Sequence, residues 1–379
     1  MSGYGITRRA LLKLGGGAAA AVAAGGAAAA RPGPRFHLGA YAAPGIVRGR
    51  LDPASGRPVR TRTAAVGRAS WLTMGPAGDI LYAVSEQPAG TISALAPDLT
   101  VLSTTPTGDG PAHVTVHPDG RFLFVSLYGG GAVVTHPIHP DGTVGAASDV
   151  RRQGAPGRPA HAHQVVVDPT GSRVLAVDLG MEAVFGYALD ARAGTLTEVF
   201  RTPLAPGSGP RHLAFHPGGR VAYLVNERNS TVTVCGWTGA ALEPGPVVAA
   251  APDRGVANRP GGIVVSADGR FVYVSNRGTN TIGVFATGAG GTTLKRIAAP
   301  DCGGIWPRDL ALDPAGRRLY VANQRSGTLT WLPVDPATGV PGRAAGAFAA
   351  PGAARILLPA VPGRAAGSFA APSAARIPL

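Results

Sequence analysis

Four residues that are distant in the sequence carry the chemistry this chain offers: His163, Arg211, Glu227 and Arg277. A histidine or a glutamate can take a proton from a water molecule. Arginine guanidinium groups hold carboxylates or phosphates, and they stabilise the negative charge that develops when water attacks a carbonyl. No short motif contains all four residues, so a common site requires a fold that brings separate segments together.

A repeated strand–turn–strand unit runs through most of the chain. Its clearest copy spans residues 209–227 (GPRHLAFHPGGRVAYLVNE), in which a glycine-containing turn joins two apolar segments of strand character. A period of about 40–50 residues with several strands per unit is typical of a β-propeller blade. Six copies align on turn glycines that are spaced by 42, 51, 48, 50 and 47 residues: Gly78, Gly120, Gly171, Gly219, Gly269 and Gly316.

The repeat predicts an all-β fold, a seven-bladed β-propeller of four-stranded blades. A single blade cannot bury both of its faces, so the blades must pack side by side around an axis. Residues 36–51 have strand character without a full copy of the unit. We expect them to pair with strands near the C-terminus, so that N- and C-terminal strands close the ring. Six or eight blades are the alternative counts.

The repeat also places the four residues at one end of the blades. His163 and Arg211 stand eight residues before their turn glycines, and Glu227 and Arg277 stand eight residues after theirs. Because the hairpin reverses the chain between these positions, both lie at the same end of a blade. We therefore predict that the four side chains converge in a central funnel, since buried charges need partners or a function.

Two more residues are candidates for binding a substrate in the same funnel. Arg308 occupies the position of Arg211 in its own blade, and His212 directly follows Arg211. Together with the two site arginines, they complete the predicted substrate-binding set. Each residue also has a structural interpretation, because His163 could pack between blades and either site arginine could simply pair with Glu227.

The overall charge does not by itself indicate a nucleic-acid partner. The chain has 379 residues and a net charge of +14, of which Arg8, Arg9 and Lys13 contribute three charges near the N-terminus. The remaining charge of about +11 is spread along the chain with no basic helix, so we predict no binding to nucleic acid. The two cysteines, Cys235 and Cys302, form neither a CxxC motif nor a zinc spacing, and no metal or cofactor is predicted.

The first 30 residues predict an export leader. Residues 7–13 (TRRALLK) resemble the twin-arginine signal, and an apolar stretch rich in alanine and glycine follows, with a small-residue cleavage site at Ala28–Ala30. We expect the twin-arginine translocase to export the chain to an extracellular, periplasmic or cell-wall space. No stable membrane anchor would remain after cleavage. A disordered alanine-rich tail is the alternative interpretation.

The predicted propeller domain spans residues 31–359, and a duplicated tail spans residues 360–379. The segment VPGRAAG at 340–346 recurs at 361–367, and the similarity continues through the FAAP that follows in both copies. A propeller needs one closing strand only. We therefore expect the first copy to close the ring and the second to be loosely attached.

Three motifs resemble the seven-bladed lactonase family, which includes propeller-type bacterial 6-phosphogluconolactonase and the fungal carboxymuconate cyclase. They are GSGPRHLAFHP, YLVNERNS and YVSNRGTNTIGVF, and the similarity extends over about residues 35–359. The histidine, the two arginines and the glutamate of the family fall on His163, Arg211, Arg277 and Glu227. The resemblance implies a small-molecule lactone as substrate and ester-bond chemistry at these four residues.

The expected reaction is a direct attack of water on the lactone, because the sequence has no GxSxG motif for a serine nucleophile. Arg211 and Arg277 would polarise the carbonyl. Either Glu227 or His163 would be the general base, and the residues leave that choice open. A phosphorylated sugar lactone is a cytoplasmic metabolite, so the export leader favours an unphosphorylated lactone.

Three other functions are compatible with the sequence. One is a non-catalytic binding or scaffold propeller, because this fold serves many functions. Another is a lactone-forming cycloisomerase of the muconate type, which would use the same cluster in reverse. The third is a metal-dependent lactonase, in which Ca²⁺ would bind oxygen-bearing residues seven positions after the turn glycines: Asp178, Asn226, Asn276 and Asn323.

Overall fold

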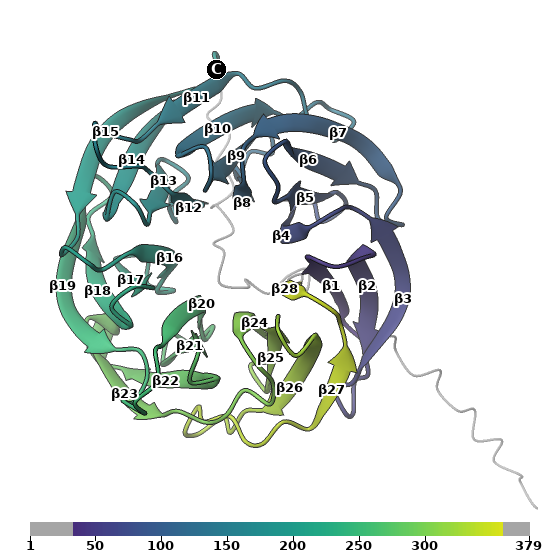
Figure 1. Ribbon diagram of the computed structural model, residues 1–379, viewed down its shortest axis with the longest axis vertical. Helices are drawn as coiled ribbons and strands as arrows, with labels where there is room; N and C mark the ends of the chain where they lie inside the picture. The colour runs from purple at the N-terminus through teal and green to yellow at the C-terminus, as the bar shows by residue number, and fades with distance from the viewer. Residues whose placement is uncertain (1–32, 359–379) are drawn as a thin grey trace, which may run out of the picture. The chain divides into compact units, whose positions relative to one another are not determined.

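The computed structural model describes residues 33–358, which form a ring of seven four-stranded antiparallel sheets (Figure 1). In each sheet one strand lies beside the central axis and the other three follow outward. From the axis outward, the first four sheets are β28 (Ala353–Leu357), β1 (Arg35–Ala40), β2 (Gly45–Leu51), β3 (Pro58–Ala65); β4 (Ala69–Met74), β5 (Leu81–Ser85), β6 (Gly90–Leu95), β7 (Val101–Gly108); β8 (Pro111–Val116), β9 (Phe122–Leu127), β10 (Ala132–Pro137), β11 (Asp149–Arg152); and β12 (Ala162–Val167), β13 (Val174–Asp178), β14 (Ala183–Asp190), β15 (Thr195–Pro203). The other three are β16 (Pro210–Phe215), β17 (Val221–Asn226), β18 (Thr231–Trp237), β19 (Leu242–Ala249); β20 (Arg259–Val265), β21 (Phe271–Arg277), β22 (Thr281–Thr287), β23 (Leu294–Ala298); and β24 (Pro307–Leu312), β25 (Arg318–Asn323), β26 (Thr328–Pro333), β27 (Gly346–Ala349).

The predicted seven-bladed fold and its mode of closure are confirmed. Six sheets consist of consecutive strands, whereas the seventh joins β1, β2 and β3 to β28 from the other end of the domain. β28 pairs with β1 in antiparallel register, with Leu38 opposite Ile356. β27 lies within the first copy of the duplicated segment, and β28 directly follows it. The predicted leader and the second copy lie outside the described residues.

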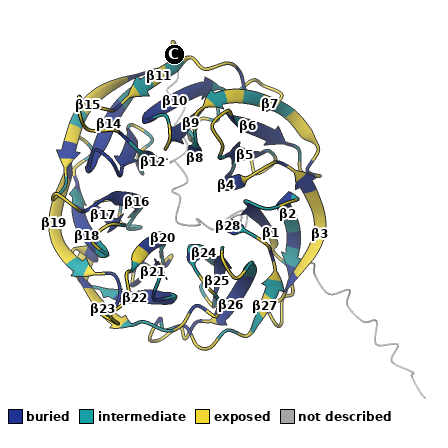
Figure 2. Cartoon of the chain, in the orientation of Figure 1, coloured by how far each residue is buried: buried dark blue, intermediate teal, exposed yellow. Residues whose placement is uncertain are grey.

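Helical structure in residues 33–358 is limited to the 3₁₀ turn η1 (Ala289–Gly291), so no helix there is long and apolar enough to cross a membrane. Burial decreases from the inner strands to the rim of the ring (Figure 2). The second strand β17 (VAYLVN) is buried along its whole length, whereas the outermost strand β7 alternates between exposed and half-buried residues. Apolar contacts hold neighbouring sheets together, as where Tyr223 and Val225 pack against Val272 and Phe285 of the next sheet.

The turn glycines have the backbone geometry that the sequence predicts. All six have φ between +67° and +78°, a region that residues with a Cβ rarely adopt. The amide of Gly219, for example, donates to the carbonyl of His216 at 2.8 Å. These turns lie at the end of the blades opposite the predicted funnel, because the hairpin strands run from one end to the other.

A column of tyrosines connects neighbouring blades near these turns. The Tyr223 hydroxyl donates to the Gly291 carbonyl of the next sheet, and the Tyr273 hydroxyl donates to the Gly339 carbonyl of the sheet after that, both at 2.8 Å. Each tyrosine stands four residues after its turn glycine. The repeat therefore positions a bond between blades as well as the turn itself.

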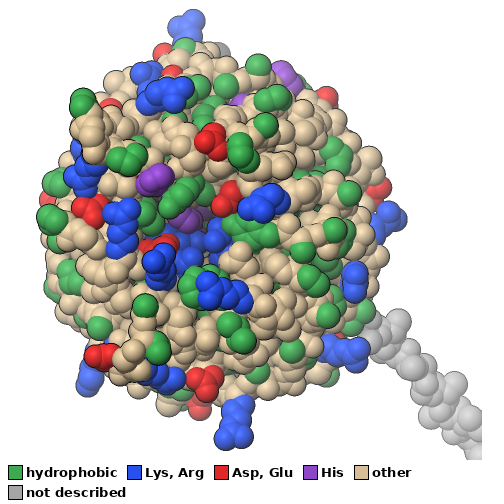
Figure 3. Space-filling view, in the orientation of Figure 1, with side chains coloured by type: hydrophobic (Ala, Val, Ile, Leu, Met, Phe, Trp, Pro, Cys, Tyr) green, Lys and Arg blue, Asp and Glu red, His purple; other side chains and the backbone are tan. Residues whose placement is uncertain are grey.

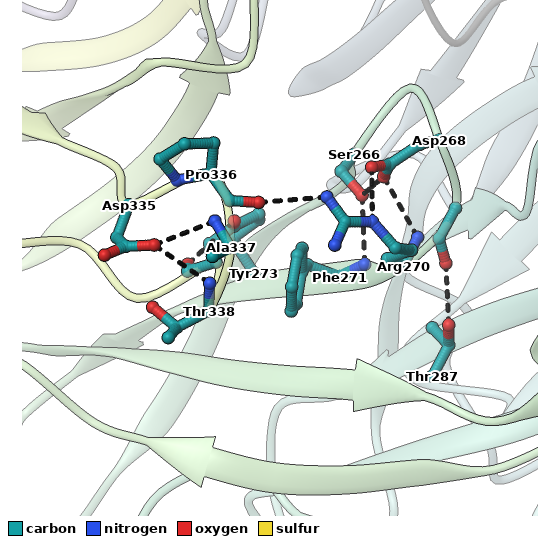
Figure 4. Close-up of polar contacts among 12 residues, drawn as sticks. Ser266, Asp268, Arg270, Phe271, Tyr273, Thr287, Asp335, Pro336, Ala337 and Thr338 are labelled. Carbon is teal, nitrogen blue, oxygen red and sulfur yellow. Dashed lines mark hydrogen bonds and ion pairs between the residues drawn. The ribbon is translucent and has the colours of Figure 1, made fainter.

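Figure 4 shows the contact between two of these sheets, with Tyr273 beside the loop that precedes β27. In the same contact, the Arg270 guanidinium donates to the Pro336 carbonyl at 2.9 Å while its Nε pairs with Asp268 at 2.7 Å. Polar groups of one blade thus satisfy backbone carbonyls of the next, which complements the apolar packing deeper in the interface.

We predict that Tyr273→Phe weakens the ring without changing its shape. The variant leaves the Gly339 carbonyl without its donor, which should lower the free energy of unfolding by about 1–3 kcal/mol. Phe124 is the natural residue at the equivalent position of another blade, so a phenyl ring fits there. Thermal unfolding should show a lower Tm than the parent protein; an unchanged Tm would contradict the proposed bond.

Candidate active site

Charged and aromatic side chains converge where the inner strands begin, at one end of the ring axis, which we call the mouth. In the space-filling view of one face, basic, acidic and histidine side chains gather in a hollow near the middle (Figure 3). All seven sheets contribute a residue to the mouth, either at the start of an inner strand or at the end of a second strand: Tyr41, Glu86, Tyr128, His163, Arg211 with Glu227, Arg277 and Arg308.

A β-bulge sets the direction of the side chain near the start of the inner strands. In β16 the pairing with β17 skips Arg211, which is an extra residue between Pro210 and His212. The same irregularity skips His163 in β12 and Arg308 in β24. A bulge takes its residue out of the regular alternation of a strand. These side chains can therefore reach the mouth instead of the packed interface between blades.

Arg211, Glu227 and Arg277 form one ion-pair cluster across two neighbouring sheets. Glu227 Oε2 lies 2.7 Å from Arg277 Nη2 and 3.2 Å from Arg211 Nε. Arg277 also donates to the carbonyls of Arg259 and Pro260, each at 2.9 Å, which holds its guanidinium in place. Three of the four residues predicted as catalytic are thus in direct contact.

Burial and charge oppose each other at this cluster. Burial alone would raise the pKa of Glu227, but Arg277 and Arg211 outweigh it and hold that pKa below its ordinary value, so the carboxylate is ionised. Burial and the neighbouring Arg277 and Arg308 lower the pKa of Arg211. The Nε of Arg211 is buried and lies 3.2 Å from Glu227 Oε2 without the alignment of a hydrogen bond, so this contact is an ion pair.

His163 completes the predicted set and lies in a group of aromatic rings. It is 6% exposed, its ring centroid is 5.0 Å from that of His212, and Tyr128 lies edge-on at 5.8 Å. Burial, followed by Arg211 and Arg308, lowers the pKa of His163 well below its ordinary value, so the imidazole is neutral at neutral pH. Its Nδ1 has no hydrogen-bond partner among the described residues.

The predicted substrate-binding candidates lie at the same mouth. His212 packs edge-on against Trp71, with ring centroids 5.1 Å apart, and Arg211 Nη1 lies 3.3 Å from its Nδ1. Arg308 belongs to a second ion pair, in which its Nη2 lies 3.3 Å from Glu86 Oε2. The structure thus places His212 directly beside the Arg211 cluster and Arg308 beside a different carboxylate.

Sequence reasoning missed Tyr41, which forms a hydrogen bond with the glutamate of the second ion pair. Its hydroxyl donates to Glu86 Oε2 at 2.5 Å, and its ring lies 5.0 Å from the Arg308 guanidinium. Burial raises the pKa of Tyr41, so the hydroxyl stays protonated and remains a donor. Tyr41 follows the closing strand β1, which lies outside the repeat alignment. Glu86 stands in the same column as Glu227 and could have been selected from that column.

A cavity of about 220 Å³ lies along the axis, one residue deeper in the inner strands than Arg211. Its lining includes Trp71, His113, His212, Asp309 and Arg355. Arg355 lies over the Trp71 ring at 4.0 Å and pairs with Asp309 at 3.0 Å, so its charge is compensated within the lining. The axis is therefore partly hollow beneath the mouth.

The column proposed for calcium has a structural use in each blade. Asp178 Oδ1 accepts backbone amides of His161, Gly180 and Met181 at 2.8–2.9 Å. The Asn226 amide nitrogen donates to two threonine hydroxyls of the adjacent strand, each at 2.9 Å. Asn276 and Asn323 make equivalent local contacts. These side chains make local contacts within their own blades, and Asn276 also donates to the carbonyl of Ala250, which follows β19 of the neighbouring sheet, at 3.1 Å. Local contacts of this kind are the turn-forming role of such residues.

Comparison with known proteins assigns the chain to a family. The family described as "Lactonase, 7-bladed beta-propeller" matches residues 35–358. The 6-phosphogluconolactonase of Bacillus subtilis is 34% identical over 242 residues, which cover 61% of this chain and 68% of that protein. The 6-phosphogluconolactonase of Formosa agariphila is 30% identical over 290 residues, covering 71% of this chain and 82% of that protein.

A solved structure shows the same fold at useful sequence similarity. The periplasmic gluconolactonase of Pseudomonas aeruginosa is 30% identical with a TM-score of 0.83, over 87% of this chain and 99% of that chain. The family match covers nearly all of the described residues, and the predicted resemblance is confirmed. The chain therefore belongs to the seven-bladed β-propeller lactonase family and is a lactone-hydrolysing enzyme.

Proposed function

We propose that this enzyme opens an unphosphorylated, sugar-type lactone by direct attack of water at the mouth of the ring. The observation that carries the proposal is the ion-pair cluster of Arg211, Arg277 and Glu227 at the mouth. Two guanidinium groups held in place by one carboxylate are preorganised to stabilise negative charge. The oxyanion formed when water adds to a lactone carbonyl carries such a charge, so the arginines favour the transition state over the ground state.

In the proposed reaction, Arg211 and Arg277 face the carbonyl oxygen while water attacks the carbonyl carbon. His163 takes one proton from the water as the new C–O bond forms, which leaves a tetrahedral oxyanion. The oxyanion collapses, the ring C–O bond breaks, and the departing alkoxide takes the proton back from His163. One water is consumed and one hydroxy acid is formed, so the proposed step needs no other reactant.

His163 is the preferred base for this step, and Glu227 is the alternative. Glu227 Oε2 already contacts both arginines, so this carboxylate is occupied by ion pairs. The Nδ1 of the neutral His163 imidazole has no hydrogen-bond partner within residues 33–358. Glu227 would then hold the two arginines in position. Arg308 and Tyr41 would contact the substrate from the other side of the mouth.

The charge balance of the mouth supports an unphosphorylated substrate. Arg211, Arg277 and Arg308 face Glu227 and Glu86, which leaves one excess positive charge among these buried groups. One excess charge matches a single oxyanion, whereas a phosphate carries about −2 at neutral pH. The structural similarity to a protein described as a periplasmic gluconolactonase supports the same substrate class.

The proposed location is outside the cytoplasm. Support comes from the Arg8-Arg9 motif, the apolar stretch that follows it and the small residues at 28–30. The twin-arginine translocase would be the partner during export. That route carries proteins that have already folded. It therefore suits a ring that closes only when strands from both ends of the domain, β1 and β28, pair with each other.

A panel of lactones tests the proposed substrate class. We expect gluconolactone to be hydrolysed faster than its spontaneous rate, with kcat/KM at least tenfold higher than for 6-phosphogluconolactone. Acid release should be followed by pH-stat, with the uncatalysed rate subtracted and EDTA present in a parallel series. A preference for the phosphorylated lactone would overturn the substrate assignment, and no turnover of any lactone would favour the binding-propeller alternative.

A His163→Gln variant, together with the pH dependence of kcat/KM, tests the choice of base. Since the pKa values of His163 and Glu227 both lie below their ordinary values, both groups are deprotonated in the free enzyme at neutral pH. The acid limb of kcat/KM, which reports the free enzyme, should therefore lie below about pH 6. His163→Gln should lower kcat by about 10²–10⁴-fold. A limb at or above pH 6.5, or a His163→Gln variant with unchanged kcat, would contradict this assignment.

A further inference from the structure

The closing sheet carries a second group of arginines, far from the mouth. β1 begins at Arg35 and leads to Tyr41, so about 20 Å of extended chain separates Arg35 from the mouth. Strand pairing places Arg35 opposite Arg50, and Arg48 opposite Arg62. Directly paired residues project to the same side of a sheet. We call Arg35, Arg48, Arg50 and Arg62 the arginine face.

The arginine face points toward the neighbouring sheet β4–β7. Residues two apart in a strand share a face, and Ile46, two residues before Arg48, packs with Leu72 and Leu81 of that sheet. Phe36 of β1, on the opposite face, packs with the sheet β24–β27 instead. The arginines therefore lie beyond the apolar part of one inter-blade interface, at the end of the ring where the turn glycines lie.

No ion pair with a carboxylate of the described residues compensates these guanidinium groups, and the polar contact that Arg50 makes is with the Gly33 carbonyl, at 3.2 Å. In residues 33–358, no carboxylate lies within 4.0 Å of any arginine of the face. Residues 1–32 and 359–379 contain no aspartate or glutamate that could supply one. Burial, followed by the charges of Arg35, Arg62 and Arg50, lowers the pKa of Arg48, and Asp98 opposes this effect from the turn between β6 and β7. Like charges opposite each other destabilise a sheet.

A buried histidine in the same row gives a second, independent sign of a ligand. His37 pairs with Arg48, is 4% exposed, and its Nδ1 has no hydrogen-bond partner among the described residues. Burial, followed by Arg48 and Arg35, lowers the pKa of His37 to about 4. A buried polar atom without a partner is costly, and a bound anion would accept a hydrogen bond there while offsetting the arginine charges.

We propose that the arginine face and His37 form a binding site for a phosphate-type oxyanion, separate from the lactone site. Guanidinium groups bind phosphate oxygens through paired hydrogen bonds, and several of them can share one tetrahedral anion. The anion could be free phosphate or a phosphate group of an anionic polymer. The sequence predicts dispersed positive charge, but strand pairing across the closing sheet gathers four arginines in one place.

The test uses inorganic phosphate and linear polyphosphate with the purified full chain. Phosphate should bind, raise the Tm, and raise the pKa of His37 by at least one unit in an NMR titration, with the signal assigned through His37→Gln. Sodium chloride at equal ionic strength should do neither. If the two probes bind with similar affinity per phosphate group, the site is one for free phosphate. If polyphosphate binds at least 100-fold more tightly, the natural ligand is a phosphate-bearing polymer. Either result supports the site.

The double variant Arg48→Gln/Arg62→Gln should lose at least tenfold in phosphate affinity and the His37 shift, while lactone hydrolysis stays unchanged. Its Tm without phosphate should equal or exceed that of the parent, because like-charge repulsion is removed, so a folding defect is not expected. Arg152→Gln/Arg220→Gln removes two exposed arginines elsewhere and should bind normally. Unchanged binding by the first variant would place phosphate at the mouth arginines and overturn the proposal. An equal chloride effect on His37 would also overturn it.

Discussion

The site depends on keeping three guanidinium groups charged where little water reaches them. The side chains of Arg211 and Arg277 are 1% and 6% exposed. Burial of such charges costs several kcal/mol per ion unless partners compensate it. Glu227 compensates both of these arginines, and Glu86 compensates Arg308. In the proposed reaction, the single positive charge left over would balance the negative charge that develops on the lactone carbonyl oxygen during attack by water.

The ring makes this arrangement possible because every blade brings the start of one strand to the axis. The bulges at Arg211, His163 and Arg308 then aim side chains at a common point. Apolar interfaces and the tyrosine bonds fix the blades relative to one another. The blades therefore hold the charged groups of the mouth ion pairs in position. At the opposite end of the closing sheet, arginines such as Arg48 and Arg62 form no ion pair with a carboxylate of the described ring, and the same electrostatic reasoning leads us to propose an external anion there.

The fold was predictable because each tight turn requires a residue with positive φ, and the sequence therefore contains a glycine at a regular spacing. Counting from that glycine located Arg211, His163 and Arg308, since the same bulge recurs in different blades. Tyr41 was not predictable in this way, because it follows a strand that has no full copy of the repeat. Its contact with the Arg308 guanidinium depends on closure of the ring, which joins residues from opposite ends of the domain.

The kcat/KM of Glu227→Gln with gluconolactone tests the central claim most directly. The substitution keeps the shape of the side chain and removes the charge that holds Arg211 and Arg277. We expect a loss of about 100-fold or more, with the variant still folded, and no loss in Glu243→Gln, which alters an exposed glutamate on β19. A Glu227→Gln enzyme within about threefold of the parent would contradict the account.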